Sequence, residues 1–142
     1  MSGRKYALGV DFGTQSGRVV LVEVDTGRET ACAVVKYVDG VIDDRLPGSG
    51  RSLRVDWALQ NPENYLAVMH EGVPEVLKKS GIMADDIIGV GIDCTSCTML
   101  PVRADGRALC QIPQYKSNPH AWVKLWKHHA AQAEAERMTE LA

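Results

Sequence analysis

Eight consecutive residues, Asp11–Arg18, hold two glycines, two hydroxyl side chains, a carboxylate and a guanidinium between two apolar runs. Glycines in a turn let a ligand anion approach the main chain, and hydroxyl and amide side chains can donate to phosphate oxygens. Arg18 adds a permanent cation with a bidentate donor fork. We therefore predict a nucleotide phosphate site. Its expected residues are Asp11, Gly13, Thr14, Gln15, Ser16 and Arg18.

Asp11 follows the first apolar run, where its carboxylate could hold Mg²⁺ directly or through water. The competing interpretation is a polar hairpin turn with a solvated arginine, and a Gly-x-x-x-Gly spacing alone would favour it. The ordered combination of Asp, Gly, Thr, Ser and Arg favours phosphate binding. The chain has no Gly-Lys-Ser/Thr segment of the Walker A type, which excludes the P-loop class.

Composition indicates a soluble globular protein: 142 residues, 45% hydrophobic and 24% charged, with a net charge of −2. So small a charge recruits neither nucleic acid nor an anionic membrane. The polar, basic start and the early Asp11 argue against a signal peptide or a membrane span, and we expect a cytoplasmic location. Cys94 and Cys97 form a C-x-x-C pair, but Cys32 and Cys110 are isolated, so reduced thiols are favoured over a zinc or redox site.

Strands are expected to flank the glycine-rich turn. The apolar runs 6–10 and 18–24 predict two strands joined by that turn, and the β-branched run from about 30 to 38 predicts a third, giving an antiparallel meander. Residues from about 39 to 54 are rich in Gly, Pro, Ser and Asp and predict a loop excursion whose role composition does not indicate.

Two helices are expected, each beginning at an Asn-Pro pair. The first runs from Asn61 to Gly81 and should be bent or divided at Pro74. The second starts at Asn118, with apolar residues at helical spacing as far as Ala133. Between them, residues 87–92 predict a buried strand, with residues 98–102 as its partner.

The segment Asp11–Arg18 with its following strand resembles the first phosphate motif of the FGGY carbohydrate kinases. Two further stretches, Gly91–Val102 and Pro119–Ala130, are similar to the ribulokinase branch of that family. The likeness covers essentially the whole chain and is weakest in the loop from 39 to 54. It implies a ribonuclease H-like (actin-like ATPase) α/β fold with a mixed sheet, in which residues 1–142 form the incomplete N-terminal part of the first of two domains.

The resemblance also implies residue roles. Thr14, Gln15, Ser16 and Arg18 fall where the family contacts the phosphates of ATP or ADP, and Asp11 matches its metal-linked acid. Ser96 and Cys97 fall in a turn that faces the sugar, and Trp126 matches a tryptophan whose ring packs against it. Without the family, core packing on a helix would be the favoured role of Trp126. Many relatives carry an acid two residues after that tryptophan, where this chain has His128.

The implied activity is transfer of the γ-phosphoryl group of Mg-ATP to a ketopentose, with L-ribulose as first choice and L-ribulose 5-phosphate as product. The general base and the adenosine pocket lie downstream in the family, so this segment alone is expected to be inactive. The expected partners are a small sugar and the rest of the kinase chain, without nucleic acid or membrane, and oligomer formation stays open. Two alternatives remain: a kinase for ribitol, D-ribulose or xylulose, and an actin-like ATPase that uses no sugar.

Overall fold

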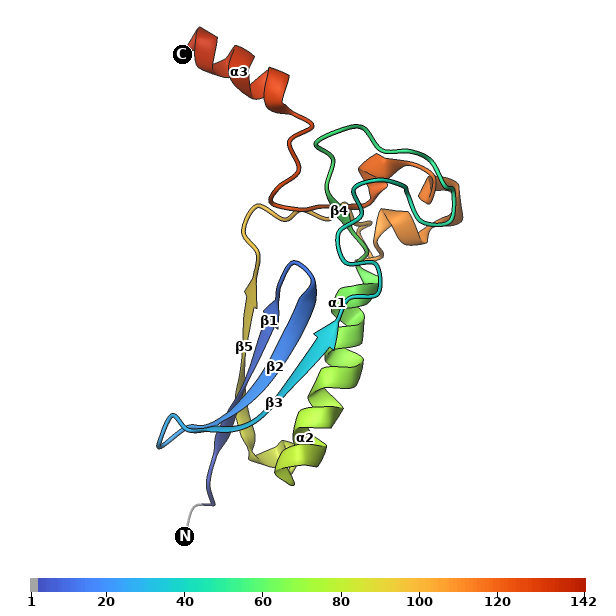
Figure 1. The fold of residues 1–142 in the computed structure, drawn as a ribbon. Helices are drawn as coiled ribbons and strands as arrows, with labels where there is room; N and C mark the ends of the chain where they lie inside the picture. The colour runs from blue at the N-terminus through green and yellow to red at the C-terminus, as the bar shows by residue number, and fades with distance from the viewer. Residues whose placement is uncertain (1–2) are drawn as a thin grey trace. The chain divides into compact units, whose positions relative to one another are not determined.

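The computed structural model describes residues 3–142, which form two compact units (Figure 1). The first, here the sheet unit, runs up to Gly40 and includes Pro62–Thr95. The second, here the loop unit, comprises Val41–Asn61 together with residues from Ser96 onward. The chain therefore crosses between the units three times, and each unit is built from two separate stretches of sequence.

The sheet unit contains a four-stranded mixed sheet in the order β3-β2-β1-β5. Strands β1 (Tyr6–Phe12), β2 (Ser16–Glu23) and β3 (Glu29–Lys36) form the antiparallel meander predicted from sequence. Strand β5 (Ile87–Cys94) pairs in parallel with β1. The predicted α/β class with a mixed sheet is confirmed.

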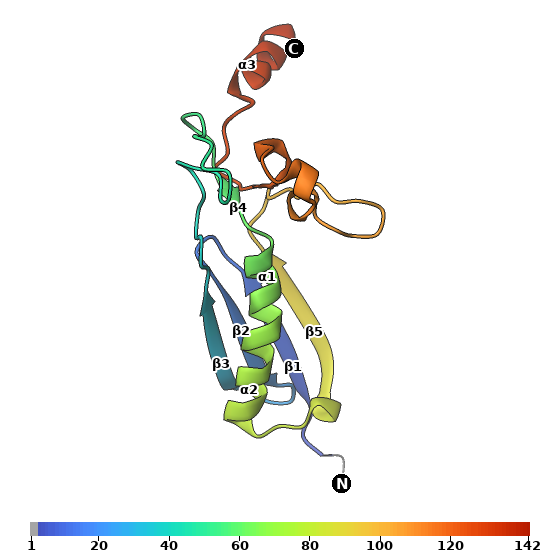
Figure 2. The ribbon, with the colours of Figure 1, turned by 90° about the vertical axis from the view of Figure 1, so that its right-hand side faces the viewer.

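One helical stretch covers one face of this sheet, packing on β2 and β3 (Figure 2). It consists of α1 (Glu63–Ala67), a π-helical turn (Val68–Gly72) and α2 (Val73–Ser80), and it ends at Gly81 in the left-handed conformation. The predicted interruption at Pro74 is present as the π turn just before it. A wider turn there accommodates the proline ring, which would clash with the carbonyl one α-helical turn earlier.

Alternating residues of the meander form the core under this helix. Val10, Val19, Leu21 and Val35 are buried with Val68 and Val76 of the helical stretch. The period of two along each strand sends the intervening residues to the opposite face of the sheet. Asp11 and Arg18 belong to that opposite face, because Val10 and Val19 beside them point to the core.

The loop unit has little regular structure. Two short strands, β4 (Leu59–Gln60) and β6 (Val123–Lys124), pair antiparallel, and a helix, α3 (Gln132–Leu141), follows with every residue exposed. Short 3₁₀ turns occur at Leu109–Gln111, Pro113–Tyr115 and Pro119–Ala121, and in the sheet unit at Ala84–Asp86. The core lies around Leu46, Trp57, Leu59 and Trp122. The predicted excursion from 39 to 54 thus supplies core residues.

The helix predicted from Asn118 is wrong. Asn118 does cap a turn, accepting from the amide of His120, but that turn lasts only three residues before the chain becomes extended. Trp122, Val123 and Leu125 are all buried, so side chains on several sides of the segment enter the core. A helix could bury only one stripe of them, and pairing with β4 buries more.

The pairing predicted for residues 98–102 is also wrong. Strand β5 has β1 as its neighbour, whereas Met99 bridges Lys124 and Val102 bridges Ala108. The neighbour of β5 is thus the parallel strand β1, which is distant in sequence, and not the hairpin partner that was expected. Local apolar patterns mark a strand but do not identify what it pairs with.

Candidate functional site

The turn between β1 and β2 is a closed, hydrogen-bonded structure. The amide of Gly13 donates to the carbonyl oxygen of Ser16 at 3.1 Å, and the amide of Tyr37 donates to the carbonyl oxygen of Gln15 at 3.0 Å. A Cβ atom on Gly13 would stand 2.8 Å from the Ser16 oxygen. Gly13 is therefore needed for the turn itself, and its amide is engaged there rather than directed outward.

Asp11 and Arg18 are neighbours on the sheet face opposite the helix. They are direct partners in the β1–β2 register, and Asp11 is also the partner of Asp93 in the parallel register with β5. Partnered residues in a sheet point to the same side. These three side chains line one open groove of about 670 Å³, together with residues of β3 such as Glu29.

Asp93 is a residue that the sequence argument did not select. Its carboxylate oxygen accepts a hydrogen bond from the amide of Cys94 at 2.9 Å, which fixes its orientation at the end of β5. The signal was available, because Asp93 ends an apolar strand in the same way as Asp11 does. What sequence could not supply was the parallel pairing that puts the two acids side by side.

Three aromatic rings pack at the turn end of this unit. Tyr65 meets Phe12 and Tyr37 edge to face, with ring centroids 5.7 and 5.9 Å apart. Burial, and then the charge of Cys94, raises the pKa of Tyr65 to about 12. Burial, followed by Tyr65 and Asp11, also raises the pKa of Tyr37 well above its usual range. Both phenols therefore stay neutral near pH 7 and serve as packing groups rather than bases.

Two of the three residues predicted to face a sugar come together in the loop unit. Cys97 and Trp126 line one cavity of about 520 Å³ with Met99, Lys124 and His128. Trp126 is 53% exposed, so the alternative role of core packing on a helix does not apply. Cys97 has a φ of 57°, a left-handed conformation that is uncommon for residues with a side chain and concentrates at functional sites. Ser96 is not among the lining residues; its carbonyl accepts from the Thr98 hydroxyl at 3.4 Å.

Lys124 organises the turn beside this cavity. Its ammonium group donates to the carbonyl oxygens of Pro119, His120 and Trp122, at 3.1, 3.0 and 3.0 Å. Burial lowers the pKa of Lys124 below its ordinary value. The three carbonyls take all three donors of a charged ammonium, so this lysine is a structural group and not a free cation for a ligand.

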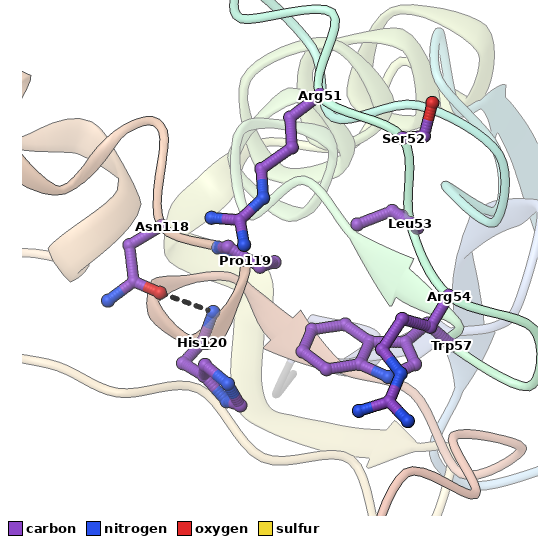
Figure 3. A pocket seen from close by; sticks show the side chains of 8 residues that line it. All are labelled: Arg51, Ser52, Leu53, Arg54, Trp57, Asn118, Pro119 and His120. Carbon is purple, nitrogen blue, oxygen red and sulfur yellow. Dashed lines mark hydrogen bonds between the residues drawn. The ribbon is translucent and has the colours of Figure 1, made fainter.

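A second, smaller cavity of about 250 Å³ in the loop unit shares His120 with the first as a lining residue (Figure 3). Figure 3 shows Arg51 extending toward Pro119 and Arg54 beside the indole of Trp57. That indole meets the ring of His120 edge to face, with centroids 5.0 Å apart. The cavity thus combines an aromatic wall with positively charged side chains.

The residues fit some cofactors better than others. Among the described residues, no group of three or more His, Cys, Asp or Glu side chains could hold a metal ion. The two neighbouring carboxylates, Asp11 and Asp93, are the hard oxygen ligands that Mg²⁺ prefers when water and phosphate complete its shell. All four cysteines are free. Within residues 3–142 no helix has the length and apolar character needed to cross a membrane.

Comparison with curated proteins bears on these predictions. The chain is 54% identical over 138 residues to a ribulokinase from Halalkalibacterium halodurans and 56% identical over 140 residues to one from Geobacillus thermodenitrificans. These alignments cover 97% and 99% of this chain. Over nearly its whole length the chain is similar in sequence to ribulokinases. That finding confirms the family resemblance seen in the three motifs.

The chain spans only about a quarter of the length of these ribulokinases, 24% and 25% respectively. A ribulokinase from Mycolicibacterium smegmatis, at 45% identity, is matched over the same share, 25%. No protein-family model matches the chain. The likeness to ribulokinases therefore rests on pairwise sequence similarity along this chain.

Solved structures agree on the fold. The chain superposes on a gluconate kinase from Lactobacillus acidophilus with a TM-score of 0.71, covering 97% of this chain and 23% of that one at 17% identity. A xyloylose kinase from Brucella ovis gives 0.69, covering 92% and 23% at 16% identity. At such identities the likeness concerns the arrangement of elements alone. The fold of this chain thus resembles that of a segment of these two kinases.

Proposed function

We propose that the full-length protein is an ATP-dependent kinase that phosphorylates a ketopentose, with L-ribulose as the preferred substrate and L-ribulose 5-phosphate as product. The observation that carries the proposal is the identity of 54–56% to ribulokinases along nearly the whole chain. The exposed indole of Trp126 beside Cys97 supports it, because an indole face packs well against the C–H face of a sugar.

The sheet unit would bind the nucleotide phosphates. Arg18 offers a bidentate guanidinium, and the hydroxyls of Thr14 and Ser16 and the amide of Gln15 offer further donors at the turn. Asp11 and Asp93 would hold magnesium, directly or through water. When bound, the ion neutralises charge on the transferring phosphoryl group. The residues described here contribute orientation and charge compensation rather than a proton acceptor.

The loop unit would supply part of the sugar site. Trp126 would pack against the sugar, Cys97 would line its cavity, and Ser96 would lie in the same turn. A general base must also accept the proton of the attacking hydroxyl. We place that base, and the adenosine pocket, outside this segment, and we therefore expect residues 1–142 alone to have no kinase activity.

We also infer that the sheet unit begins a ribonuclease H-like domain of the actin-like kind, in a two-domain kinase. An antiparallel meander followed by a parallel fourth strand supports this inference. Ile88, Val90 and Ile92 of β5 are more than half exposed, and the matched ribulokinases are about four times as long. The remaining chain would cover these side chains and provide the second domain, whose closure would exclude water from the reaction.

A substrate panel tests the proposed function. The purified full-length protein is supplied with Mg-ATP and, in turn, L-ribulose, D-ribulose, D-xylulose, ribitol or glycerol, and ADP release is followed. We expect the highest kcat/KM with L-ribulose. A higher value with another sugar would correct the substrate. If no sugar raises ADP release above the basal rate, the kinase proposal is wrong and a sugar-independent ATPase becomes the better account.

A second measurement tests whether Trp126 contacts the sugar. Replacing Trp126 by Ala should raise the KM for L-ribulose about tenfold or more and leave the KM for ATP nearly unchanged, because only the sugar loses a packing surface. Trp126→Phe should retain part of the affinity. Equal effects on both KM values would contradict a role specific to the sugar.

A further inference from the structure

Trp126 is held in place by main-chain bonds on both sides of it. The amide of Leu125 donates to the carbonyl oxygen of Ala58 at 3.0 Å, and the amide of His129 donates to that of Asp56 at 2.9 Å. The indole between these two anchors remains half exposed. The attachment of its neighbours to residues 56–58 therefore helps to set its position.

One side chain completes this attachment. The amide of Ala58 donates to Nδ1 of His128 at 3.1 Å. The same imidazole meets the indole of Trp57 edge to face, with centroids 4.9 Å apart at an interplanar angle of 71°. Trp57 is buried and belongs to the core of the loop unit. His128 thus joins the segment that bears Trp126 to a fixed part of the fold.

The hydrogen bond specifies the protonation state of His128. An imidazole nitrogen that accepts a hydrogen bond carries no proton, so the ring is neutral with its proton on Nε2. The surroundings favour this state. Burial lowers the pKa of His128, and the neighbouring Lys124, His120 and His129 oppose a second positive charge. Glu134 is the acidic residue that lines the same cavity.

We propose that His128 is a positioning residue for sugar recognition: accepting from Ala58 and packed on Trp57, it holds Trp126 in the orientation that binds the ketopentose. This inference rests on the proposed function. His128 and Trp126 line the same cavity, so a displacement of His128 would change the shape of the predicted sugar site. A merely structural histidine would affect stability without affecting sugar affinity selectively.

The test compares two substitutions of His128 in the full-length protein. In His128→Asn, the side-chain oxygen replaces Nδ1 as acceptor, whereas His128→Leu removes the acceptor. L-Ribulose affinity is measured by tryptophan fluorescence without ATP, and KM values are measured for both substrates. We expect His128→Leu to weaken L-ribulose binding about tenfold and to leave the KM for ATP unchanged. The L-ribulose affinity of His128→Asn should stay within about threefold of that of the unchanged protein.

The matched control is His129→Leu. This neighbour is exposed, and its link to Asp56 runs through the main chain, so the substitution should leave sugar affinity unchanged. The proposal is overturned if His128→Leu lowers the melting temperature but not the sugar affinity, or if His128→Asn is as impaired as His128→Leu. If the full-length protein binds ATP but no ketopentose, the proposed function is wrong, and this inference, which rests on it, is wrong as well.

A pH series keeps the proposal testable if His128→Leu does not fold. Protonation of Nδ1 would break the bond from Ala58, so L-ribulose affinity of the unchanged protein should fall as the pH drops below the ordinary His value of about 6.5. His128→Asn should lack that component of the pH dependence. An identical pH dependence in both proteins would overturn the assignment.

Discussion

Gly17 of β2 lies directly against Val68 of the π-helical turn. A Cβ atom on Gly17 would stand 2.9 Å from Cγ1 of Val68, nearer still to Cγ2, and 3.2 Å from the carbonyl oxygen of Asp11. Val68 is fully buried, and side chains in a packed core have little room to move. The second glycine of the predicted phosphate turn therefore serves the close approach of helix and hairpin, which fixes the strand that carries Arg18.

Gly17→Ala should destabilise the protein by about 1–3 kcal/mol, because an added methyl group in a packed core forces side chains from their positions. The measurement is the melting temperature of the full-length protein. Gly89→Ala is the matched control, since a Cβ atom there meets nothing within 4 Å. Adding Val68→Ala should recover part of the loss. Additive effects of the two substitutions would show that the contact does not limit packing.

Arg18→Ala should weaken binding of Mg-ATP about tenfold or more, since a charge-assisted bond to phosphate would be lost. Calorimetric titration of the full-length protein measures it. Arg28→Ala is the control, because Arg28 lies in the turn at the far end of β2, 3.9 Å from the Glu23 carboxylate. Unchanged nucleotide affinity in the Arg18 variant would show that this guanidinium is only solvated.

Asp93→Asn should weaken the binding of Mn²⁺, used as a spectroscopic substitute for Mg²⁺, in the presence of ADP. Asparagine can still accept from the Cys94 amide, so the change removes charge while keeping the local bond. Asp11→Asn should have an effect at least as large. Asp85→Asn, an exposed acid in the same unit, serves as the control. Mn²⁺ affinity equal to that of the unchanged protein would exclude Asp93 from the metal site.

Lys124→Met should lower stability by about 2 kcal/mol, because it keeps the aliphatic stem but leaves the carbonyls of Pro119, His120 and Trp122 without their charged donor. Thermal unfolding measures the loss. Lys127→Met, three residues along the chain, should change the melting temperature little. Equal effects of the two substitutions would mean that the three bonds contribute nothing net.

The lowered pKa of His128 makes a separate prediction about stability. The pKa of His128 is about 6.5 in the unfolded chain and lower in the folded protein. At pH values between these two, the unfolded chain binds the proton more readily than the folded chain does. The contribution of His128 is therefore complete above about pH 6.5 and declines as the pH falls through this interval. Melting temperatures at about pH 7.5 and 5.5 should differ more for the unchanged protein than for His128→Asn. If the melting temperatures of the two proteins changed equally between these pH values, the lowered pKa of His128 would be contradicted.

The sequence by itself determined the local features. Apolar alternation located the meander, an Asn-Pro pair and a left-handed glycine bounded the first helix, and a proline marked its interruption. These features depend on interactions between residues that are close in sequence, so they can be predicted from the sequence. The motif Asp11–Arg18 and its resemblance to the FGGY kinases pointed to ribulokinases, which the comparisons confirmed.

Only the tertiary structure decided which distant residues meet. The pairing of Asp11 with Asp93 follows from the parallel register of β1 and β5, and the attachment of His128 to Ala58 joins positions 70 residues apart. The apolar spacing after Asn118 suggested a helix, yet β6 is extended because burial of Trp122, Val123 and Leu125 against β4 outweighs local propensity. Long-range pairing carries no local signature in sequence, which is why the surroundings of Trp126 had to be seen in three dimensions.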